Sequence, residues 1–242
     1  MIGFGDYTKG DYTKEVEIST ITSLTDKRLV KIDPQEEGFF DAVLNFKPTN
    51  KGINDFIEAV AEVKEARIEA FYRAIYDPVE VGDHMVTFNK GMTPAIGNST
   101  KWWVKTAKNM PHVEGKQWHL ATDYQYYAFL VWLINQLVKE GKCVKKALNW
   151  VVIDSRKLGN YHNSKKTPKK DPFELTGSRC ICGICDLSNT FKILAVSNRK
   201  ARGFWKAGGY CEYSGSTCPL ANLTYIDKED PWALLCVGLL VL

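Results

Sequence analysis

The sequence has no long apolar run, no secretion signal and no large excess of one charge. Its uninterrupted apolar stretches are all shorter than the roughly 20 residues of a membrane-crossing helix, so we expect no transmembrane segment. The final Trp232–Leu242 is apolar but too short to span a bilayer, and is interpreted as a buried closing strand. Met1–Tyr7 lacks the basic flank and apolar stretch of a secretory signal, so no signal peptide is predicted there.

The charge balance argues against two classes of partner. The chain carries 32 Lys and Arg and 28 Asp and Glu, for a net charge of +4. A protein that binds nucleic acid or an anionic membrane by its overall charge needs a larger basic excess. We therefore predict no nucleic-acid partner.

Apolar residues are plentiful, so the sequence predicts a folded protein. Hydrophobic residues make up 45% and aromatic residues 12% of the 242 positions, which is enough for a packed core. The seven cysteines are an odd number, so they cannot all pair within one chain, and the redox compartment stays open. They occupy positions 143, 180, 182, 185, 211, 218 and 236.

The clearest helical pattern covers residues 53–76, where apolar residues recur at three- and four-residue steps. Asn50 or Asn54 could cap this helix, and Asp77-Pro78 is expected to end it. Packing of the apolar stripe on the chain's own core is favoured over a role as an oligomer seam.

The rest of the chain as far as residue 173 alternates between loops and helices. Residues 78–117 are interpreted as loop-rich, and a helix follows from Asp123 to about Glu140, capped by Thr122 or Asp123 and ended by Gly141. A third helix is predicted from Val144 to about Leu158. Residues 159–173 are expected to form an exposed basic loop.

Four segments resemble, in the same order, the motifs of formylglycine-generating-enzyme-like domains, a branch of the C-type lectin fold. Trp118–Tyr126 resembles their W-R-L-P-T-E-x-E-W signature, and Cys185–Ile193 is similar to D-M-x-G-N-V-W-E-W. Arg202–Trp205 is similar to R-G-G-S-W, and Val237–Val241 to the terminal G-F-R-L-V strand. The resemblance covers about residues 85–242. It implies an α+β fold of the C-type lectin kind, with two helices around a small twisted antiparallel sheet and long loops.

A narrower resemblance lies within residues 203–242. Gly203–Gly209 reads G-F-W-x-A-G-G, Pro219–Leu223 reads P-L-A-x-L, and Gly238–Leu242 reads G-x-L-V-L. This combination resembles the variable proteins of diversity-generating retroelements, found in phages, archaeal viruses and bacteria. In that family the C-terminal part is rewritten at adenines of a repeated template, mostly in Asn codons, and the resulting side chains bind changing ligands.

The resemblance implies that residues 210–230 carry the binding side chains. The predicted ligand-binding residues are of types that Asn-codon changes can produce: Tyr210, Cys211, Tyr213, Ser214, Gly215, Ser216, Thr217, Cys218, Asn222, Thr224, Tyr225, Ile226 and Asp227. The same changes cannot produce Lys, Glu or Trp, so Glu212, Lys228, Glu229 and Trp232 are assigned to the scaffold or lie outside the scheme.

The composition of this segment suits binding on physical grounds as well. Tyrosine adds contact area at low entropic cost, and Ser, Gly and Asn add adaptable hydrogen bonding. Tyr210, Tyr213 and Tyr225 are the expected hot spots. Phe204, Trp205, Gly208 and Gly209 would form the scaffold beneath them.

Enzymatic branches of the same fold fit less well. Formylglycine-generating enzymes bind copper through two closely spaced cysteines in an Arg-rich motif, whereas Cys211 and Cys218 are further apart and lack the arginines. The ergothioneine-type branch needs an iron-binding histidine cluster, and the four histidines, at positions 84, 112, 119 and 162, are scattered. The chain is therefore predicted not to be an enzyme, with a copper-dependent oxidase or a structural assembly protein as the alternatives.

The run Cys180-x-Cys182-x-x-Cys185 leaves three possibilities open. These thiols could hold zinc with Cys211 or Cys218 as a fourth ligand, form one disulfide, or pack as small buried groups.

Calcium-dependent sugar binding is not supported, because the E-P-N, Q-P-D and W-N-D motifs are missing. Asp186 and Asn189 are expected to tie backbone turns rather than bind a metal. No cofactor or metal is predicted.

The sequence thus predicts an N-terminal extension with an amphipathic helix over residues 1–80. A C-type lectin-fold ligand-binding domain follows over residues 81–242, with a variable region at about 205–242. The expected partner is a protein or a cell-surface ligand of unidentified chemistry. The family resemblance implies display on a virion or a cell surface.

Overall fold

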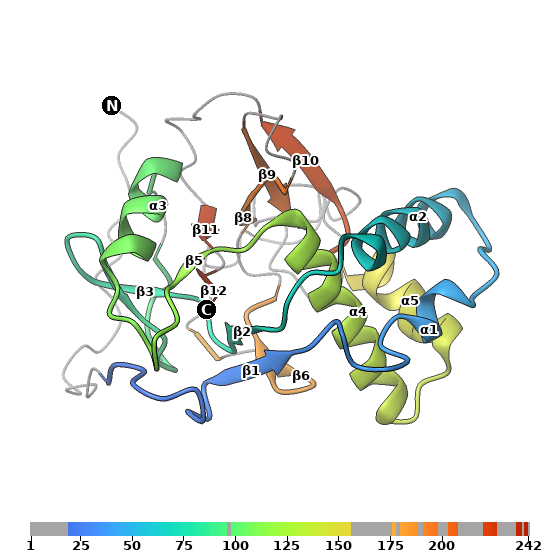
Figure 1. Cartoon of the computed structure of the whole chain (residues 1–242), viewed down its shortest axis with the longest axis horizontal. Helices are drawn as coiled ribbons and strands as arrows, with labels where there is room; N and C mark the ends of the chain where they lie inside the picture. Colours follow the sequence, from blue (N-terminus) through green and yellow to red (C-terminus); the bar gives the residue numbers. More distant parts are fainter. Residues whose placement is uncertain are drawn as a thin grey trace, which may run out of the picture.

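The computed structural model describes residues 19–95, 98–155, 176–177, 180–187, 191–197, 203–207, 220–226, 236–238 and 240–241. These residues form helices together with small sheets whose strands pair mostly antiparallel (Figure 1). The predicted α+β class is therefore confirmed. Within the described ranges, no helix is long and apolar enough to cross a membrane.

The described helices all lie before residue 153, whereas the described strands occur along the whole chain. The helices are α1 (Asp41–Leu44), α2 (Lys51–Ala66), α3 (Thr100–Asn109), α4 (Asp123–Lys139) and α5 (Val144–Val152). The strands of the first half are β1 (Leu29–Ile32), β2 (Phe71–Ala74), β3 (Val79–Gly82), β4 (Met85–Thr87) and β5 (His119–Leu120). Those of the second half are β6 (Cys180–Ile181), β7 (Ile184–Cys185), β8 (Phe191–Ala195), β9 (Phe204–Ala207), β10 (Leu223–Ile226), β11 (Cys236–Gly238) and β12 (Leu240–Val241).

Helices α2, α4 and α5 pack together and enclose the larger hydrophobic core (Figure 1). The centre of α4 is completely buried, including Phe129, Leu130 and Leu133. The apolar stripe of α2 lies in the same core, with Ile53 and Val60 fully buried. The prediction that this stripe packs on the chain's own core is confirmed.

Helix α2 is shorter than predicted. The Asn50 side chain accepts a hydrogen bond from the Ile53 amide at 3.0 Å, so Asn50 is the N-cap. The helix ends at Ala66, because Arg67 turns into the left-handed conformation with φ of 49°. The prediction that it continues to residue 76 is wrong: Phe71–Ala74 forms β2, where pairing with β1 and β12 outweighs the local helical spacing.

Helix α4 confirms its predicted ends. Thr122 accepts a hydrogen bond from the Gln125 amide, and the Gln125 side chain accepts one from the Thr122 amide, which makes a capping box. At the other end Gly141 has a positive φ of 94°. The amides of Gly141 and Lys142 reach back to Val138 and Leu137, as in a Schellman motif.

Residues 78–117 contain more regular structure than the predicted loops. Strands β3 and β4 form a hairpin, and α3 follows, capped by the Ser99 hydroxyl, which accepts from the Trp102 amide at 3.2 Å. Trp103 of α3 is fully buried, in the smaller core with Phe88 and Trp118. The Ser-Thr start of this helix was the local signal that the sequence prediction missed.

One four-stranded sheet has the order β1-β2-β12-β5. Strand β12 therefore lies between β2 and β5, and Val241 pairs with both Arg73 and His119. This sheet joins residues on both sides of position 80, and α2 shares a core with α4. The division into an extension over 1–80 and a domain over 81–242 stays a prediction.

The other four-stranded sheet has the order β10-β9-β8-β11. Strands β8, β9 and β10 pair antiparallel, whereas β11 runs parallel to β8. Strand β8 also contacts the start of α4, because the Ala195 amide donates to Ala121 O at 2.9 Å. The two sheets are thus connected through the β5–α4 junction.

Two sequence predictions fall partly or wholly outside the described residues. Helix α5 begins at Val144 as predicted, but it ends at Val152 rather than near Leu158, because residues 153–155 form a turn and a 3₁₀ segment. The continuation to Leu158 and the basic loop over 159–173 lie outside the described ranges, apart from residues 153–155.

Candidate ligand-binding face

The described part of the predicted binding segment is strand β10 with the residues just before it. Asn222 precedes the strand, and Thr224, Tyr225 and Ile226 lie in it. The other predicted ligand-binding residues lie outside the described residues: Tyr210, Cys211, Tyr213, Ser214, Gly215, Ser216, Thr217, Cys218 and Asp227. The structure therefore assigns a backbone position to four of the predicted residues.

Strand β10 stands at one end of its sheet and pairs with β9 alone among the described strands. The register sets Thr224 opposite Lys206, Tyr225 opposite Trp205 and Ile226 opposite Phe204. An end strand has one backbone edge that its own sheet does not use, which makes it a position where a partner can approach.

The predicted scaffold strand β9 rests on the helical core. Ala207 is fully buried, and Trp205 packs against the larger core. Phe204 packs against the smaller core instead, so β9 bridges the two. Gly208 and Gly209, the other predicted scaffold residues, lie outside the described residues.

A buried pair of hydrogen bonds fixes the chain directly before β10. The Leu220 amide donates to Ser155 Oγ at 2.9 Å, and the Tyr126 hydroxyl donates to Leu220 O at 3.0 Å. Ser155 in turn donates to Val151 O at 2.9 Å. Leu220 itself is only 1% exposed, so water cannot reach its backbone amide and carbonyl. Side chains from the helical layer satisfy both groups instead.

A second clamp holds the turn after β8 at the first turn of α4. The Ser197 amide donates to Asp123 Oδ1 at 2.7 Å, and its hydroxyl also donates to that carboxylate. The Tyr124 amide donates to Ser197 Oγ at 3.2 Å. A carboxylate at the N-terminus of a helix is favoured by the helix dipole, so Asp123 serves both the helix and the clamp.

The residues that hold this sheet in place are far apart in the sequence and were not predicted. Tyr126 is recognisable as part of the apolar stripe of α4, and a buried tyrosine hydroxyl normally has a partner. Its partner Leu220 is 94 positions away, and Ser155 is 65 positions from Leu220. No local pattern links residues at these separations.

The three closely spaced cysteines form a hairpin. Cys180 in β6 pairs with Cys185 in β7, and a disulfide joins them. Cys182 lies in the turn with φ of 50° as a free thiol, whose pKa burial and the neighbouring Glu140 raise to about 12. Of the three possibilities that the sequence leaves open, the structure has the disulfide, which removes two of the thiols a zinc site would need.

Asp186 ties backbone turns, as predicted. Both of its carboxylate oxygens accept from the Gly177 amide, at 2.9 and 3.0 Å, and Oδ2 also accepts from the Asp77 amide at 3.2 Å. Gly177 is required here, because a Cβ would stand 2.6 Å from Lys90 Cγ and φ is +77°. Asn189 lies outside the described residues.

A buried arginine stands close to the same carboxylate. Arg73 of β2 is 2% exposed and its guanidinium lies 3.9 Å from the centre of the Phe129 ring. Burial lowers its pKa to about 10, and the negative charges of Asp77 and Asp186 act against that shift. The attraction of Asp77 and Asp186 therefore offsets part of the cost of burying the Arg73 charge.

No group of three or more His, Cys, Asp and Glu residues is arranged to hold a metal ion within the described ranges. The cysteine pair Cys211 and Cys218 of the oxidase alternative lies outside those ranges.

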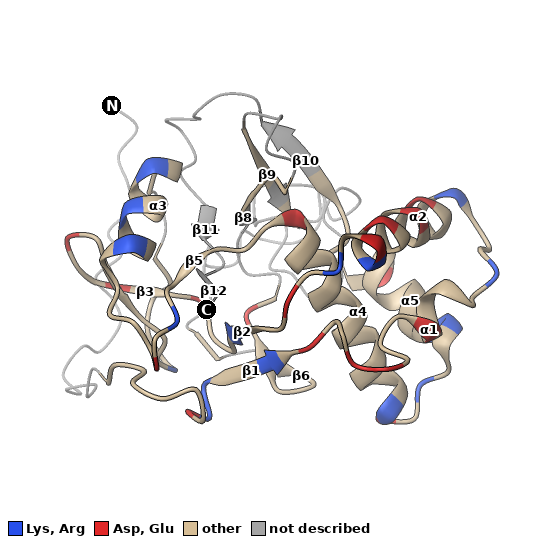
Figure 2. Cartoon of the chain, viewed as in Figure 1, with Lys and Arg blue, Asp and Glu red and all other residues tan. Residues whose placement is uncertain are grey.

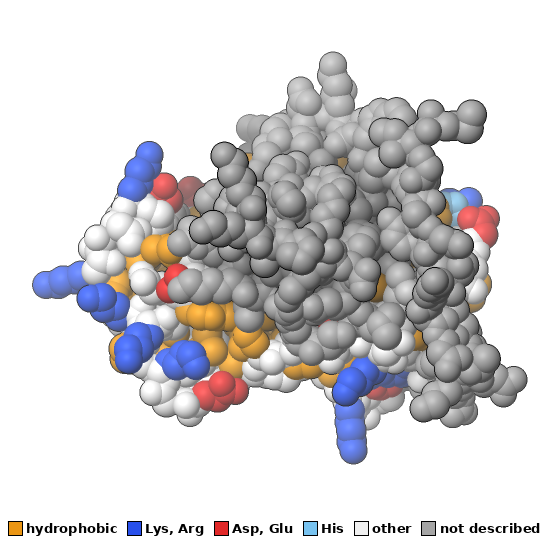
Figure 3. Space-filling view, turned by 180° about the vertical axis from the view of Figure 1, so that it is seen from behind, with side chains coloured by type: hydrophobic (Ala, Val, Ile, Leu, Met, Phe, Trp, Pro, Cys, Tyr) orange, Lys and Arg blue, Asp and Glu red, His pale blue; other side chains and the backbone are white. Residues whose placement is uncertain are grey.

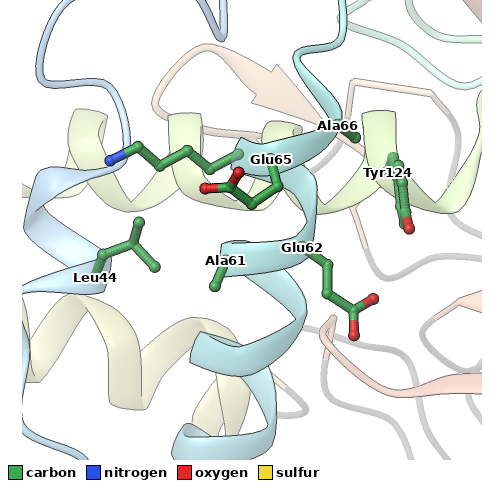
Figure 4. Close-up of a pocket in the computed structure, with 7 residues that line it drawn as sticks. Leu44, Ala61, Glu62, Glu65, Ala66 and Tyr124 are labelled. Carbon is green, nitrogen blue, oxygen red and sulfur yellow. The ribbon is translucent and has the colours of Figure 1, made fainter.

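A surface depression of about 700 Å³ lies over α2 (Figure 4). It is bordered by Leu44, Ala61, Glu62, Glu65 and Tyr124, and the two carboxylates come from the exposed side of α2. Figure 4 shows these side chains spread apart rather than directed at one point. The arrangement lacks the converging polar groups of a catalytic pocket.

Charged groups are mixed over the described surface. Figure 2 shows both basic and acidic residues on α2 and α4, and a row of basic residues on α3. Seen from behind, Lys and Arg side chains gather at the end formed by the helical layer, with acidic side chains among them (Figure 3). This mixture agrees with the balanced composition.

Comparison with known proteins adds no relative. No protein-family model matches the chain, and no curated protein matches it significantly.

Proposed function

We propose that the chain is a non-catalytic ligand-binding protein with a C-type lectin fold, related to the variable proteins of diversity-generating retroelements. Residues 210–230 present changeable side chains, and the ligand is a protein or another cell-surface molecule. The supporting resemblance consists of the ordered motifs in residues 118–126, 185–193, 202–209 and 237–242.

The observation that carries the proposal is the way β10 is supported. The chain enters β10 at Leu220, whose amide and carbonyl are held by Ser155 and Tyr126. The strand then follows the edge of a sheet whose neighbour β9 packs on both cores. A backbone held by groups outside the variable segment can keep its path while the variable side chains change.

Three features of the architecture support the lectin-fold part of the proposal. Helix α4 follows directly on β5 at the Trp118–Tyr126 motif, with its capping box in place. Strand β12, from the terminal motif, pairs with β5 and with β2. The Cys185–Ile193 motif contributes the last residue of β7 and the first half of β8.

The genetic part of the proposal has a direct test in the genome. We expect a near-copy of the coding DNA for residues 205–242 beside a reverse transcriptase gene, differing chiefly at adenines. A genome with neither feature would remove the retroelement assignment and leave the fold proposal in place.

The binding part is tested with two display libraries of the full chain. One library varies Asn222, Thr224, Tyr225 and Ile226 together with the other predicted ligand-binding residues. The matched library varies an equal number of exposed positions, including Asp55, Glu58 and Glu62 of α2. Selection on a folded model protein should yield binders from the first library and not from the second.

Stability decides whether these residues are replaceable. Variants that change one of these residues at a time should keep their melting temperatures within a few degrees, because a surface substitution usually changes stability by less than about 0.5 kcal/mol. General unfolding across that library would contradict the proposal.

A further inference from the structure

A groove of about 450 Å³ lies on the other half of α4, away from the clamp at Asp123. Its walls are β1, the segment from Asp33 to Phe39, and the α4 face that carries Trp132 and Gln136. Strand β1 and α4 contact each other in this part of the molecule (Figure 1). The volume lies within the range of small-molecule sites.

Trp132 supplies one wall of the groove. Its indole is only partly buried, and its ring plane is inclined by 22° to that of Phe129, with the ring centres 6.3 Å apart. Phe39, which is 6% exposed and in edge contact with Phe40, also lines the groove. The indole is therefore supported by packed aromatic rings while part of it stays accessible from the groove.

Two side-chain amides in the groove are held by backbone carbonyls. Asn135 Nδ2 donates to Phe39 O at 2.8 Å, and Gln35 Nε2 donates to Ile68 O at 3.0 Å. Each amide group then retains its oxygen and a second N–H. Fixed amides with both an acceptor and a donor left over suit a ligand whose hydroxyls can both donate and accept.

The charges of the groove cancel. Lys31 and Asp33 form a salt bridge at 2.9 Å, and the remaining charged lining residues are Glu36 and Lys139. Two positive and two negative side chains give no net attraction for an anion or a cation.

We propose that this groove binds a neutral sugar, with one C–H face of a pyranose ring against Trp132 and hydroxyls bonded to Asn135 and Gln35. A pyranose combines an apolar face with a rim of hydroxyls, and the groove pairs an accessible indole with fixed amides and balanced charge. This site uses none of the β10 residues, so it goes beyond the proposed function. The sugar-binding proposal can therefore be tested independently of the proposed function.

The test is a titration of the full chain with glucose, galactose, mannose and N-acetylglucosamine. Each sugar is added up to about ten millimolar, because a small polar ligand is expected to bind with a Kd of about one millimolar. The signals of the tryptophan indole N–H groups are followed by nitrogen-15 NMR, with Trp132 assigned from Trp132→Phe. At least one neutral sugar should shift the Trp132 signal. If none of the four moves it, the proposal is overturned without any variant.

The variant arm compares Trp132→Leu with Trp150→Leu, a partly buried tryptophan of α5 outside the groove. Trp132→Leu should weaken sugar binding by about two- to tenfold, the loss expected for an aromatic contact, and Trp150→Leu should leave the affinity unchanged. Equal affinity in Trp132→Leu would overturn the proposal. So would a preference for glucuronate or glucosamine over the neutral sugars, because it would mean that charge dominates recognition.

Discussion

The helical layer and the β8–β10 sheet are held in different ways. The layer of α2, α4 and α5 is stabilised by apolar burial, with most of one face of α4 inaccessible to solvent. The described part of the sheet reaches the same core through Leu194, Ala207 and Leu220, and it is also joined to the layer by side-chain hydrogen bonds at Leu220 and Ser197. A stably packed helical layer can therefore fix the position of a neighbouring sheet with a few hydrogen bonds, here those at Leu220 and Ser197.

The largest effect is expected in the layer itself. Replacing Leu133 with alanine should destabilise the protein by about 2–5 kcal/mol, because the residue is fully buried and the change leaves a cavity. Leu44→Ala in α1, where the side chain is only partly buried, is the matched control and should cost less. Chemical denaturation measures the free energy of unfolding of both variants. Equal losses of stability would mean that burial in the helical layer does not dominate the stability of the protein.

The next effect concerns the fixed point at Leu220. Ser155→Ala leaves the buried Leu220 amide without its acceptor, so we expect a loss of about 1–3 kcal/mol. Ser23→Ala removes an exposed hydroxyl that bonds to Glu114 and should change stability by less than about 0.5 kcal/mol. An equally small effect of Ser155→Ala would show that the sheet is not fixed at this point.

Removing the other bond at Leu220 should have a smaller effect. Tyr126→Phe keeps the buried ring but loses the donor to Leu220 O, at an expected cost of about 1 kcal/mol. Tyr127→Phe is the control, because no hydrogen bond of its hydroxyl is found among the described residues. Thermal unfolding should give a lower melting temperature for Tyr126→Phe than for Tyr127→Phe. Identical melting temperatures would show that the Tyr126 hydroxyl does not help to hold β10.

The last prediction concerns reactivity rather than stability. The pKa of Cys182 is raised to about 12, because burial and the adjacent Glu140 disfavour the thiolate. A raised pKa means that the reactive thiolate is scarce at pH 8 and becomes about tenfold more abundant for each pH unit until the pKa is approached. Alkylation of Cys182 by iodoacetamide should therefore still accelerate above pH 10.

Cys143, which is exposed, provides the internal comparison in the same sample. Peptide mass spectrometry under non-reducing conditions reports both sites. Alkylation of Cys182 as fast as that of Cys143 at pH 8 would show that the β6–β7 turn does not rest against the end of α4.

Local patterns in the sequence determined several elements correctly. The Thr122 cap, the Gly141 stop and the Asn50 cap each depend on residues within one or two turns of the helix end, so spacing alone predicts them. The turn-tying role of Asp186 was also foreseen. By contrast, β2 and α3 were mispredicted, the first because strand pairing overrode its helical spacing and the second because its Ser99 cap was overlooked.

The sequence by itself determined the α+β class, the ends of α4, and a set of motifs that suggests a binding function. Tertiary structure alone decided that Leu220 is held by Tyr126 and Ser155, that β12 lies between β2 and β5, and that Trp132 and Gln35 share a groove. The physical reason is distance along the chain. A cap or a helix stop is satisfied by its near neighbours, whereas these contacts join residues that only the packing of the whole chain brings together.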